Sequence, residues 1–231
     1  MADLFDDPSS RPPVEAGLAA ALDLYDPACR RCPRLAGFLD EVHAAHPTYW
    51  CRPVPPFGEL DARFLLVGLA PGMHGANATG RPFTGDWCGP LLYSSLHRFG
   101  FASAPESLAR DDGLTLSDCR VTNAVKCLPP ANKPELLEIR ACNAYLSKEI
   151  AAMPRLSVIL ALGAVAHQAV LEAFGARRAA HPFAHHARHA LPRGITLFDS
   201  YHVSRYNTNT GRLTEAMFHA VLADVRAALA A

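Results

Sequence analysis

The stretch SVILALGAVAHQAVLEAF, residues 157–174, decides the fold class of this 231-residue chain. It opens with the apolar run Ser157–Leu162, which suits a buried strand, and Gly163 leads directly into the helical stretch Ala164–Phe174. So short a transition from strand to helix is typical of the βα units of α/β proteins. Three further strands are predicted over Arg63–Leu69, Arg120–Val125 and Ile195–Asp199. Helices are predicted over Val14–Leu24, Pro33–Ala45, Gly89–Phe99, Pro134–Ala152 and Arg212–Ala230.

Strands and helices alternate along most of the chain, which predicts an α/β fold with a mostly parallel sheet covered by helices on both faces. In open α/β sheets, ligands bind beyond the carboxyl ends of the strands. Polar or glycine-rich segments are expected there at residues 68–86 after the first strand, at Asn123 in the second, and at residues 200–211 after the fourth. We therefore expect these three segments to converge on the functional site.

The composition sets broader limits on the class of protein. Lys plus Arg and Asp plus Glu number 22 each, so the net charge argues neither for nor against nucleic acid, and a DNA-binding face must be a local patch. The acidic, proline-rich start lacks the apolar core of a secretory signal, and no run of 18 apolar residues predicts a membrane span. Seven cysteines without an export signal indicate a reducing, cytoplasmic location. We expect a disordered tail over residues 1–13 and one domain, acting as a monomer, over residues 14–231.

Four of the seven cysteines have a spacing that suits a metal centre. Cys29 and Cys32 form a C-x-x-C pair, in which a turn can point both sulfurs the same way. Cys127 and Cys142 complete a set of four if the fold brings the two pairs together. Four thiolates suit zinc or an iron–sulfur cluster, and spacing alone does not choose between them. Ordinary buried cysteines are the alternative for both pairs, and the simpler interpretation for the other three.

Four motifs extend this pattern over most of the chain, from residue 29 to residue 214. They are GLAPGMHGANATGRPFTGD at 68–86, VTNAVKCLPPANKP at 121–134, ILALGAVAHQAV at 159–170 and SYHVSRYNTNTGRLT at 200–214. With the C-x-x-C pair, the combination closely resembles the B-type (family 5) enzymes of the uracil-DNA glycosylase superfamily. The resemblance implies a three-layer α/β/α sandwich around a four-stranded parallel sheet. It also implies a [4Fe–4S] cluster on Cys29, Cys32, Cys127 and Cys142.

The resemblance also assigns parts of the site. Relatives outside the B type carry a polar, water-activating residue at the position of Ala70, so the group that positions water must come from elsewhere, and Asp86 is the candidate. Some relatives have a bulky residue at the position of Gly72, and the small residue here implies room for purine bases. The last motif normally begins His-Pro-Ser. The residue Val203 replaces this Pro, which implies a less rigid loop.

Breaking an N-glycosidic bond leaves an oxocarbenium-like sugar and a base anion, so the enzyme needs groups for the base, the sugar and the attacking water. We expect His202 to donate to a base oxygen and Asn123 to bond the base edge. Phe83 is expected to stack on the extruded base, and Asp86 to serve the water or the sugar cation. Each residue also has a structural alternative. His202 is then a hydrogen-bonded structural histidine and Asn123 caps a turn. Phe83 is a core residue, and Asp86 is the N-cap of the helix beginning near Gly89.

Two polar segments complete the set of candidates. The loop Val203–Thr210 is expected either to enter the minor groove of DNA beside a flipped base or to be an ordinary surface loop. Its candidate contacts are Ser204, Arg205, Tyr206 and Asn207. The stretch HPFAHHARH, residues 181–189, holds four histidines. We expect a solvated loop there, with a transition-metal site as the alternative.

These features predict a monofunctional DNA glycosylase that removes uracil, and other deaminated bases such as hypoxanthine, from DNA and leaves an abasic site. The alternative is a non-catalytic, zinc-stapled nucleic-acid-binding module, which would need neither Asp86 nor His202. A nucleotide hydrolase on a similar sheet would require a phosphate loop such as G-x-x-x-x-G-K-[ST], and the sequence contains none.

Overall fold

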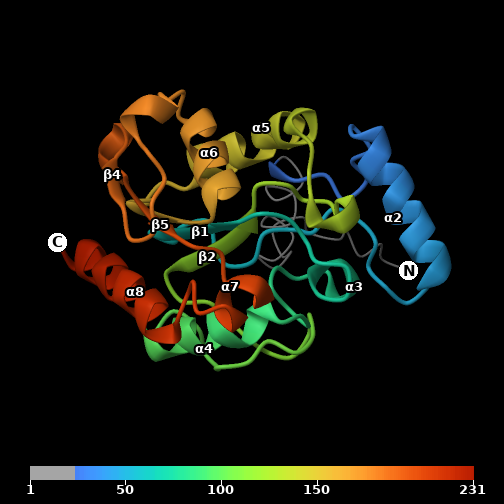
Figure 1. The fold of residues 1–231 in the computed structure, drawn as a ribbon, viewed down its shortest axis with the longest axis horizontal. Coiled ribbons are helices and arrows are strands. Elements are labelled where there is room, and N and C mark those ends of the chain that lie inside the picture. Colours follow the sequence, from blue (N-terminus) through green and yellow to red (C-terminus); the bar gives the residue numbers. More distant parts are fainter. Residues whose placement is uncertain (1–23) are drawn as a thin grey trace, which may run out of the picture.

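A computed structural model describes residues 24–231 of the chain and contains one five-stranded sheet with the strand order β2-β1-β3-β5-β4 (Figure 1). Strands β1, β2, β3 and β5 pair in parallel, and β4 pairs antiparallel with β5. The strands are β1 Phe64–Gly68, β2 Cys119–Asn123, β3 Val158–Leu162, β4 Arg188–Ala190 and β5 Thr196–Ser200. The predicted α/β class and the four predicted strands are therefore confirmed, and they form the parallel part of the sheet.

Every residue of β1, β2 and β3 is buried, which explains why β1 and β3 are continuous apolar runs rather than alternating ones. In β2 the buried residues include the polar Arg120, Thr122 and Asn123. Successive side chains point to opposite faces of the sheet. Leu66 and Leu160 are register partners on one face, and Leu65 and Ile159 are partners on the other. Each face packs into its own apolar core.

Helices cover both faces of the sheet and give the expected three layers (Figure 1). The core of one face contains side chains of α4 and α8, and the core of the other contains side chains of α5 and α6. The helices are α2 Pro33–Ala45, α3 Ala76–Thr79, α4 Cys88–Arg98, α5 Leu136–Ala152, α6 Ala164–Ala173, α7 Arg205–Asn209 and α8 Glu215–Ala230. Short 3-10 helices occur at Pro130–Asn132, Arg178–Ala180 and Pro192–Gly194.

Two helices begin later than the sequence pattern predicts, because capping residues fix their starts. Glu135 and Glu138 form a capping box at the start of α5, which begins at Leu136 rather than at Pro134. The hydroxyl of Thr214 accepts the backbone N–H of Met217 and starts α8.

Two sequence interpretations need correction. The sheet has a fifth strand, β4, which overlaps the end of the histidine-rich stretch that the sequence predicts to be a solvated loop. This strand has three residues, two of them exposed, so no apolar run marks it. The polar loop after β5 contains the single-turn helix α7, which Ser204 caps by accepting the N–H of Asn207. A cap residue followed by only one turn gives too little periodicity for a helix to be recognised from sequence.

The predicted tail over residues 1–13 lies outside the described residues, as does nearly all of the predicted helix Val14–Leu24. The division into a tail and one domain stays a prediction. Within residues 24–231, no helix is long and apolar enough to cross a membrane.

Candidate active site

A cavity of about 390 Å³ opens at the carboxyl ends of the parallel strands. This volume falls in the range usual for pockets that bind small ligands. The three segments expected there all contribute, and the turn between β3 and α6 adds a fourth wall. The lining residues are Leu69, Ala70, Gly72, Ala76, Phe83, Asp86, Cys88, Asn123, Asn132, Leu162, Gly163, Ala164, Val165, His202 and Ser204. The structure thus brings the sequence-predicted candidates of the catalytic and base-binding groups to one cavity.

Asn123, the last residue of β2, lines the cavity with an amide that the fold leaves unsatisfied. The residue is 3% exposed, and its Oδ1 atom has no hydrogen-bond partner among the residues that the structure describes. A buried polar atom without a partner is uncommon and costs about 1–3 kcal/mol. The absence of a side chain at Gly68 makes room for this amide, since a Cβ atom there would lie 2.3 Å from Asn123 Oδ1.

Phe83 is both a core residue and a wall of the cavity. Its ring is 6% exposed and packs in the apolar core on the α4 side of the sheet, as the structural alternative expected. The centre of the ring lies 6.1 Å from that of the His202 imidazole. Phe83 has a φ of 54°, a left-handed conformation that is strained for a bulky side chain. Such strain persists only where the surroundings hold the residue in place, so the position of the ring is tightly fixed.

His202 follows β5 and places a half-buried imidazole in the cavity. Burial lowers the pKa of this imidazole to about 4, so the ring is neutral at neutral pH. The Nδ2 atom of Asn207 donates to the backbone carbonyl of His202 at 2.8 Å and ties the segment to α7. Val203, which was expected to loosen this segment, is fully buried in the core beside the sheet. Packing therefore anchors the loop where proline would have restricted its backbone.

Asp86 combines the two roles that the sequence left open. Its Oδ1 atom accepts the backbone N–H of Cys88, the first residue of α4, at 2.9 Å, so the carboxylate does help to start the helix. Its Oδ2 atom is directed towards the loop after β1, because a Cβ atom added to Gly72 would lie 2.9 Å from it. Burial raises the pKa of Asp86 above its ordinary value, and the hydrogen bonds from the backbone offset this only in part.

The candidate DNA-contacting residues lie beside the mouth of the cavity. Ser204 lines the cavity and caps α7, and Asn207 is turned inward to the His202 carbonyl. Arg205 and Tyr206 are exposed, and 70% of Tyr206 is open to solvent. The guanidinium of Arg205 lies over the indole ring of Trp87 at 5.0 Å.

Sequence reasoning missed two residues of this region. Trp87 is 54% exposed although large apolar side chains are usually covered, and its Nε1 atom donates to the hydroxyl of Thr208 at 3.1 Å. Asn132 lines the cavity from a left-handed backbone conformation with a φ of 56°. The adjacency of Trp87 to Asp86 was a usable signal, but the exposure of Trp87 is a tertiary property. Nothing in the sequence singles out Asn132.

The four cysteines predicted as metal ligands line one small cavity on the α2 side of the molecule. Cys29 and Cys32 lie at the start of α2, Cys127 follows β2, and Cys142 lies in α5. Burial raises the pKa of the Cys32, Cys127 and Cys142 thiols. The same cavity contains the hydroxyl of Tyr145, which is buried and has no partner among the described residues.

Polar contacts support this cysteine set. The backbone N–H of Lys126 points at the Cys142 sulfur at 3.3 Å, as amides do towards thiolates. A bidentate ion pair between Arg34 and Glu138, at 2.8 and 2.7 Å, joins α2 to α5 beside the sulfurs. The geometry thus unites two cysteine pairs that are 95 or more residues apart in the sequence.

The fold and the cavity define a class of α/β proteins that bind a small ligand at the carboxyl edge of a parallel sheet. The family model of the Uracil DNA glycosylase superfamily matches residues 55–226, and the chain belongs to that superfamily.

Individual relatives show which branch of the superfamily the chain resembles more strongly. The chain is 51% identical over 204 residues to a Type-5 uracil-DNA glycosylase of Thermus thermophilus, covering 86% of this chain and 93% of the relative. It is 43% identical over 190 residues to a Type-5 uracil-DNA glycosylase of Pyrobaculum aerophilum, covering 80% and 82%. A Type-4 uracil-DNA glycosylase of the same organism is 37% identical over 126 residues, or 54% and 56% of the two chains. The predicted resemblance to family 5 is therefore confirmed.

Proposed function

We propose that this protein is a monofunctional DNA glycosylase that hydrolyses the N-glycosidic bond of uracil in DNA and leaves an abasic site. The observation that carries the proposal is the cavity at the carboxyl edge of the sheet, where the unpaired amide of Asn123 meets the neutral imidazole of His202 and the carboxylate of Asp86. A non-catalytic zinc module would have no use for these three groups, and membership of the superfamily also disfavours it.

His202 is suited to stabilise the departing base. The leaving uracil anion carries its charge on carbonyl oxygens, and a neutral imidazole can donate one N–H to such an oxygen. Because burial lowers the pKa of His202 to about 4, the ring takes up a second proton only in acid near or below pH 4 and is neutral at neutral pH. A fixed donor aimed at developing negative charge contributes on the order of 3 kcal/mol to catalysis.

Asn123 and Phe83 are suited to hold the extruded base. A side-chain amide offers a donor and an acceptor side by side, which matches the edge of a pyrimidine. The unpaired Oδ1 atom of Asn123 would gain an N–H partner from uracil. The fixed ring of Phe83 supplies an apolar surface on which a flipped base can stack.

Asp86 is suited to act at the other end of the bond. With Ala70 unable to bind water through its side chain, Asp86 is the acidic side chain of the cavity lining. One carboxylate oxygen holds the start of α4 while the other remains for the attacking water or the cationic sugar. The raised pKa of Asp86 keeps the group basic enough to accept a proton from water.

The mouth of the cavity is suited to bind DNA. The side chains of Arg205 and Tyr206 project from α7, and Trp87 adds an exposed aromatic ring beside them. Arginine can bind phosphate, and aromatic rings can occupy the gap left by a flipped base. We propose that this surface, with Ser204 and Asn207 fixing the position of α7, holds the strand around the damaged base.

We further propose that the cavity accepts hypoxanthine as well as uracil. Ala70 and Gly72 present little side-chain volume, and the cavity of about 390 Å³ leaves room for a purine. The hypoxanthine anion also carries its charge on a carbonyl oxygen, so the same donor serves both bases.

Cys29, Cys32, Cys127 and Cys142 fit a [4Fe–4S] cluster. Burial raises the pKa of the Cys32, Cys127 and Cys142 thiols, so their thiolate forms need compensating positive charge, which metal ions supply. Sulfurs on one zinc ion lie about 3.8 Å apart, given bonds of about 2.3 Å. No three of these four sulfurs, all within the described residues, lie within 4.8 Å of one another. This wider spacing favours a cluster, which would tie α2 to α5 and take no part in hydrolysis.

The activity is tested with purified protein and oligonucleotides that contain uracil, hypoxanthine or thymine opposite each base, followed by alkali to cleave abasic sites. We expect cleavage at uracil and hypoxanthine and not at normal bases. Iron and sulfide analysis of the same preparation tests the cluster. One zinc and no iron would contradict the cluster, and a Cys29→Ala variant that stays stable and fully loaded would contradict the ligand set.

The role of Asp86 is tested by Asp86→Asn, because asparagine keeps an oxygen for the Cys88 N–H but cannot act as a base. We expect about a 100-fold slower single-turnover rate on every substrate, with an unchanged melting temperature. In the wild type, the rate should fall as the pH drops through the raised pKa of Asp86, because the protonated carboxyl is inactive. The variant should lack this acid limb. A variant with a normal rate and a lowered melting temperature would show that Asp86 is only a helix cap.

A further inference from the structure

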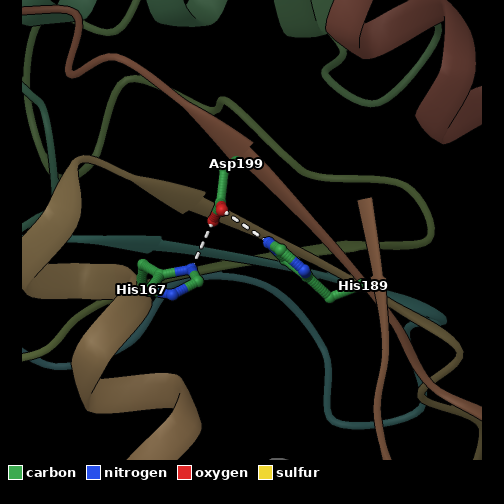
Figure 2. A group of neighbouring side chains, drawn as sticks. All are labelled: His167, His189 and Asp199. Atoms are coloured by element: carbon green, nitrogen blue, oxygen red, sulfur yellow. Dashed lines mark hydrogen bonds and ion pairs between the residues drawn. The ribbon is translucent and has the colours of Figure 1, made fainter. Parts of the chain in front are cut away.

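A second group of polar side chains lies outside the cavity, near the edge of the sheet that β4 forms. His167 of α6, His189 of β4 and Asp199 of β5 point towards one another (Figure 2). The Asp199 carboxylate lies 2.8 Å from His167 Nδ1 and 3.1 Å from His189 Nε2. The exposed fractions of these side chains are 3% for His167, 10% for His189 and 0% for Asp199. One buried carboxylate is therefore held between two imidazoles.

If both imidazole rings are neutral, His167 and Asp199 place two hydrogen-bond acceptors against each other with no positive charge between them. The Nε2 atom of His167 lies 2.9 Å from the backbone carbonyl of His181. A carbonyl only accepts, so Nε2 carries the proton, and Nδ1 of a neutral ring has a lone pair. That lone pair would face the Asp199 carboxylate, another acceptor, at 2.8 Å. The contact becomes favourable when a cation, either a second proton on His167 or a metal ion, joins the two atoms.

The arrangement has the properties of a transition-metal site. The three ligand atoms all lie within 4.8 Å of one another. Two imidazole nitrogens and one carboxylate oxygen are a donor set that zinc accepts, with a further position for water. Tetrahedral ligands at about 2.0–2.1 Å from zinc lie about 3.3 Å apart, so the His167–Asp199 contact of 2.8 Å and the His189–Asp199 contact of 3.1 Å need to open by only a few tenths of an ångström. The His181 carbonyl orients the His167 ring, as backbone carbonyls commonly do for metal-bound histidines.

We propose that His167 Nδ1, His189 Nε2 and the Asp199 carboxylate bind one divalent transition-metal ion of the zinc type. An ion can reach them through β4, where His189 is partly open and the neighbouring residues are exposed. None of the three ligands lines the cavity of the candidate active site. The ion would fasten the short strand β4 to β5 and α6, and it would stabilise the fold without entering the hydrolytic reaction.

The experiment is a titration of the full-length, purified protein with zinc alone, after a chelator wash and with iron measured before and after. We expect the wild type to take up one zinc per chain and its melting temperature to rise by about 5 °C at saturation. X-ray absorption at the zinc edge should show nitrogen and oxygen neighbours and no sulfur, which separates this site from the cysteines.

His189→Gln removes one ligand from the edge strand, where a change is least disruptive. It should bind zinc about 100-fold more weakly or worse and lose the rise in melting temperature. The matched control is His186→Gln, in the same segment, whose ring contacts Asp224 on the surface and should not alter zinc uptake. Equal uptake by His189→Gln and the wild type, or a sulfur shell around the zinc, would overturn the proposal. If the wild type does not take up one zinc per chain, the proposal is also wrong. The positive charge between His167 and Asp199 would then be a second proton on His167.

Discussion

Two buried polar groups lie on or beside strand β2, and only one of them has its hydrogen bonds satisfied within the protein. In the first, the fully buried carboxylate of Glu149 bonds Arg120 at 2.7 Å, Thr122 at 3.0 Å and Lys126 at 3.2 Å. In the second, one residue beyond Thr122, the Oδ1 atom of Asn123 is equally buried and has no partner within residues 24–231.

The difference separates residues that hold the fold from residues reserved for a ligand. Every oxygen of Glu149 is bonded, so its burial cost is offset inside the protein. Burial acts to raise the pKa of Glu149, but the positive charges of Lys126 and Arg120 outweigh it and lower the pKa. The Oδ1 atom of Asn123 has no hydrogen-bond partner among the described residues, and we propose that a bound base supplies one. The four predictions that follow test this contrast.

The largest expected effect is on the satisfied region. Glu149→Ala leaves Arg120 and Lys126 as buried, unpaired charges and should lower the free energy of unfolding by about 3–5 kcal/mol. For a chain of this size the melting temperature should fall by about 10 °C. Thermal unfolding measures this, with Glu172→Ala as the control, because its pair with Arg140 is exposed and contributes about 1 kcal/mol at most. Equal melting temperatures of the two variants would refute the assigned role.

His202→Ala should behave in the opposite way to Glu149→Ala, with a large loss of cleavage rate and little change in the free energy of unfolding. Removing the donor to the leaving base should slow single-turnover cleavage of uracil about 100-fold or more. The loss should be smaller for bases that leave more easily, since a stable anion needs less help. Affinity for DNA should persist, because most of it comes from phosphate contacts. A normal cleavage rate would remove His202 from the catalytic group.

Asn123→Ala should slow uracil cleavage about 10-fold, the scale of one lost hydrogen bond, and affect hypoxanthine less because a purine presents a different edge. Its melting temperature should change far less than that of Glu149→Ala, since no internal hydrogen bond to Oδ1 is lost. Parallel cleavage assays on both bases measure the first effect. A large drop in stability with equal loss on both bases would make Asn123 a structural residue.

Gly72→Ala should have the smallest effect, a loss of a few fold, and it distinguishes two views of this position. The added Cβ would lie 2.9 Å from Asp86 Oδ2, so the carboxylate must shift. We therefore expect uracil and hypoxanthine cleavage to slow together. If Gly72 acts only as a size filter, hypoxanthine cleavage alone should suffer, and the comparison of the two rates decides between these views.

Short-range patterns account for the parts of the structure that were predicted well. The apolar runs of β1 and β3, the short strands β2 and β5, and the long helices are all marked by their local sequence. The convergence of three segments at one edge followed from parallel topology, which places the carboxyl ends of neighbouring strands together. The strand β4 and the helix α7 were missed because three residues or one turn leave almost no periodic signal.

The sequence by itself determined the fold class, the family and the candidates Asp86, Asn123 and His202, because these depend on local runs and motifs. Only the tertiary structure decided that Asp86 both starts α4 and faces the cavity, that Val203 is anchored in the core, and that His167, His189 and Asp199 meet. Those facts depend on burial and on contacts between distant segments. Such contacts are set by how the sheet and helices pack, and no local pattern encodes them.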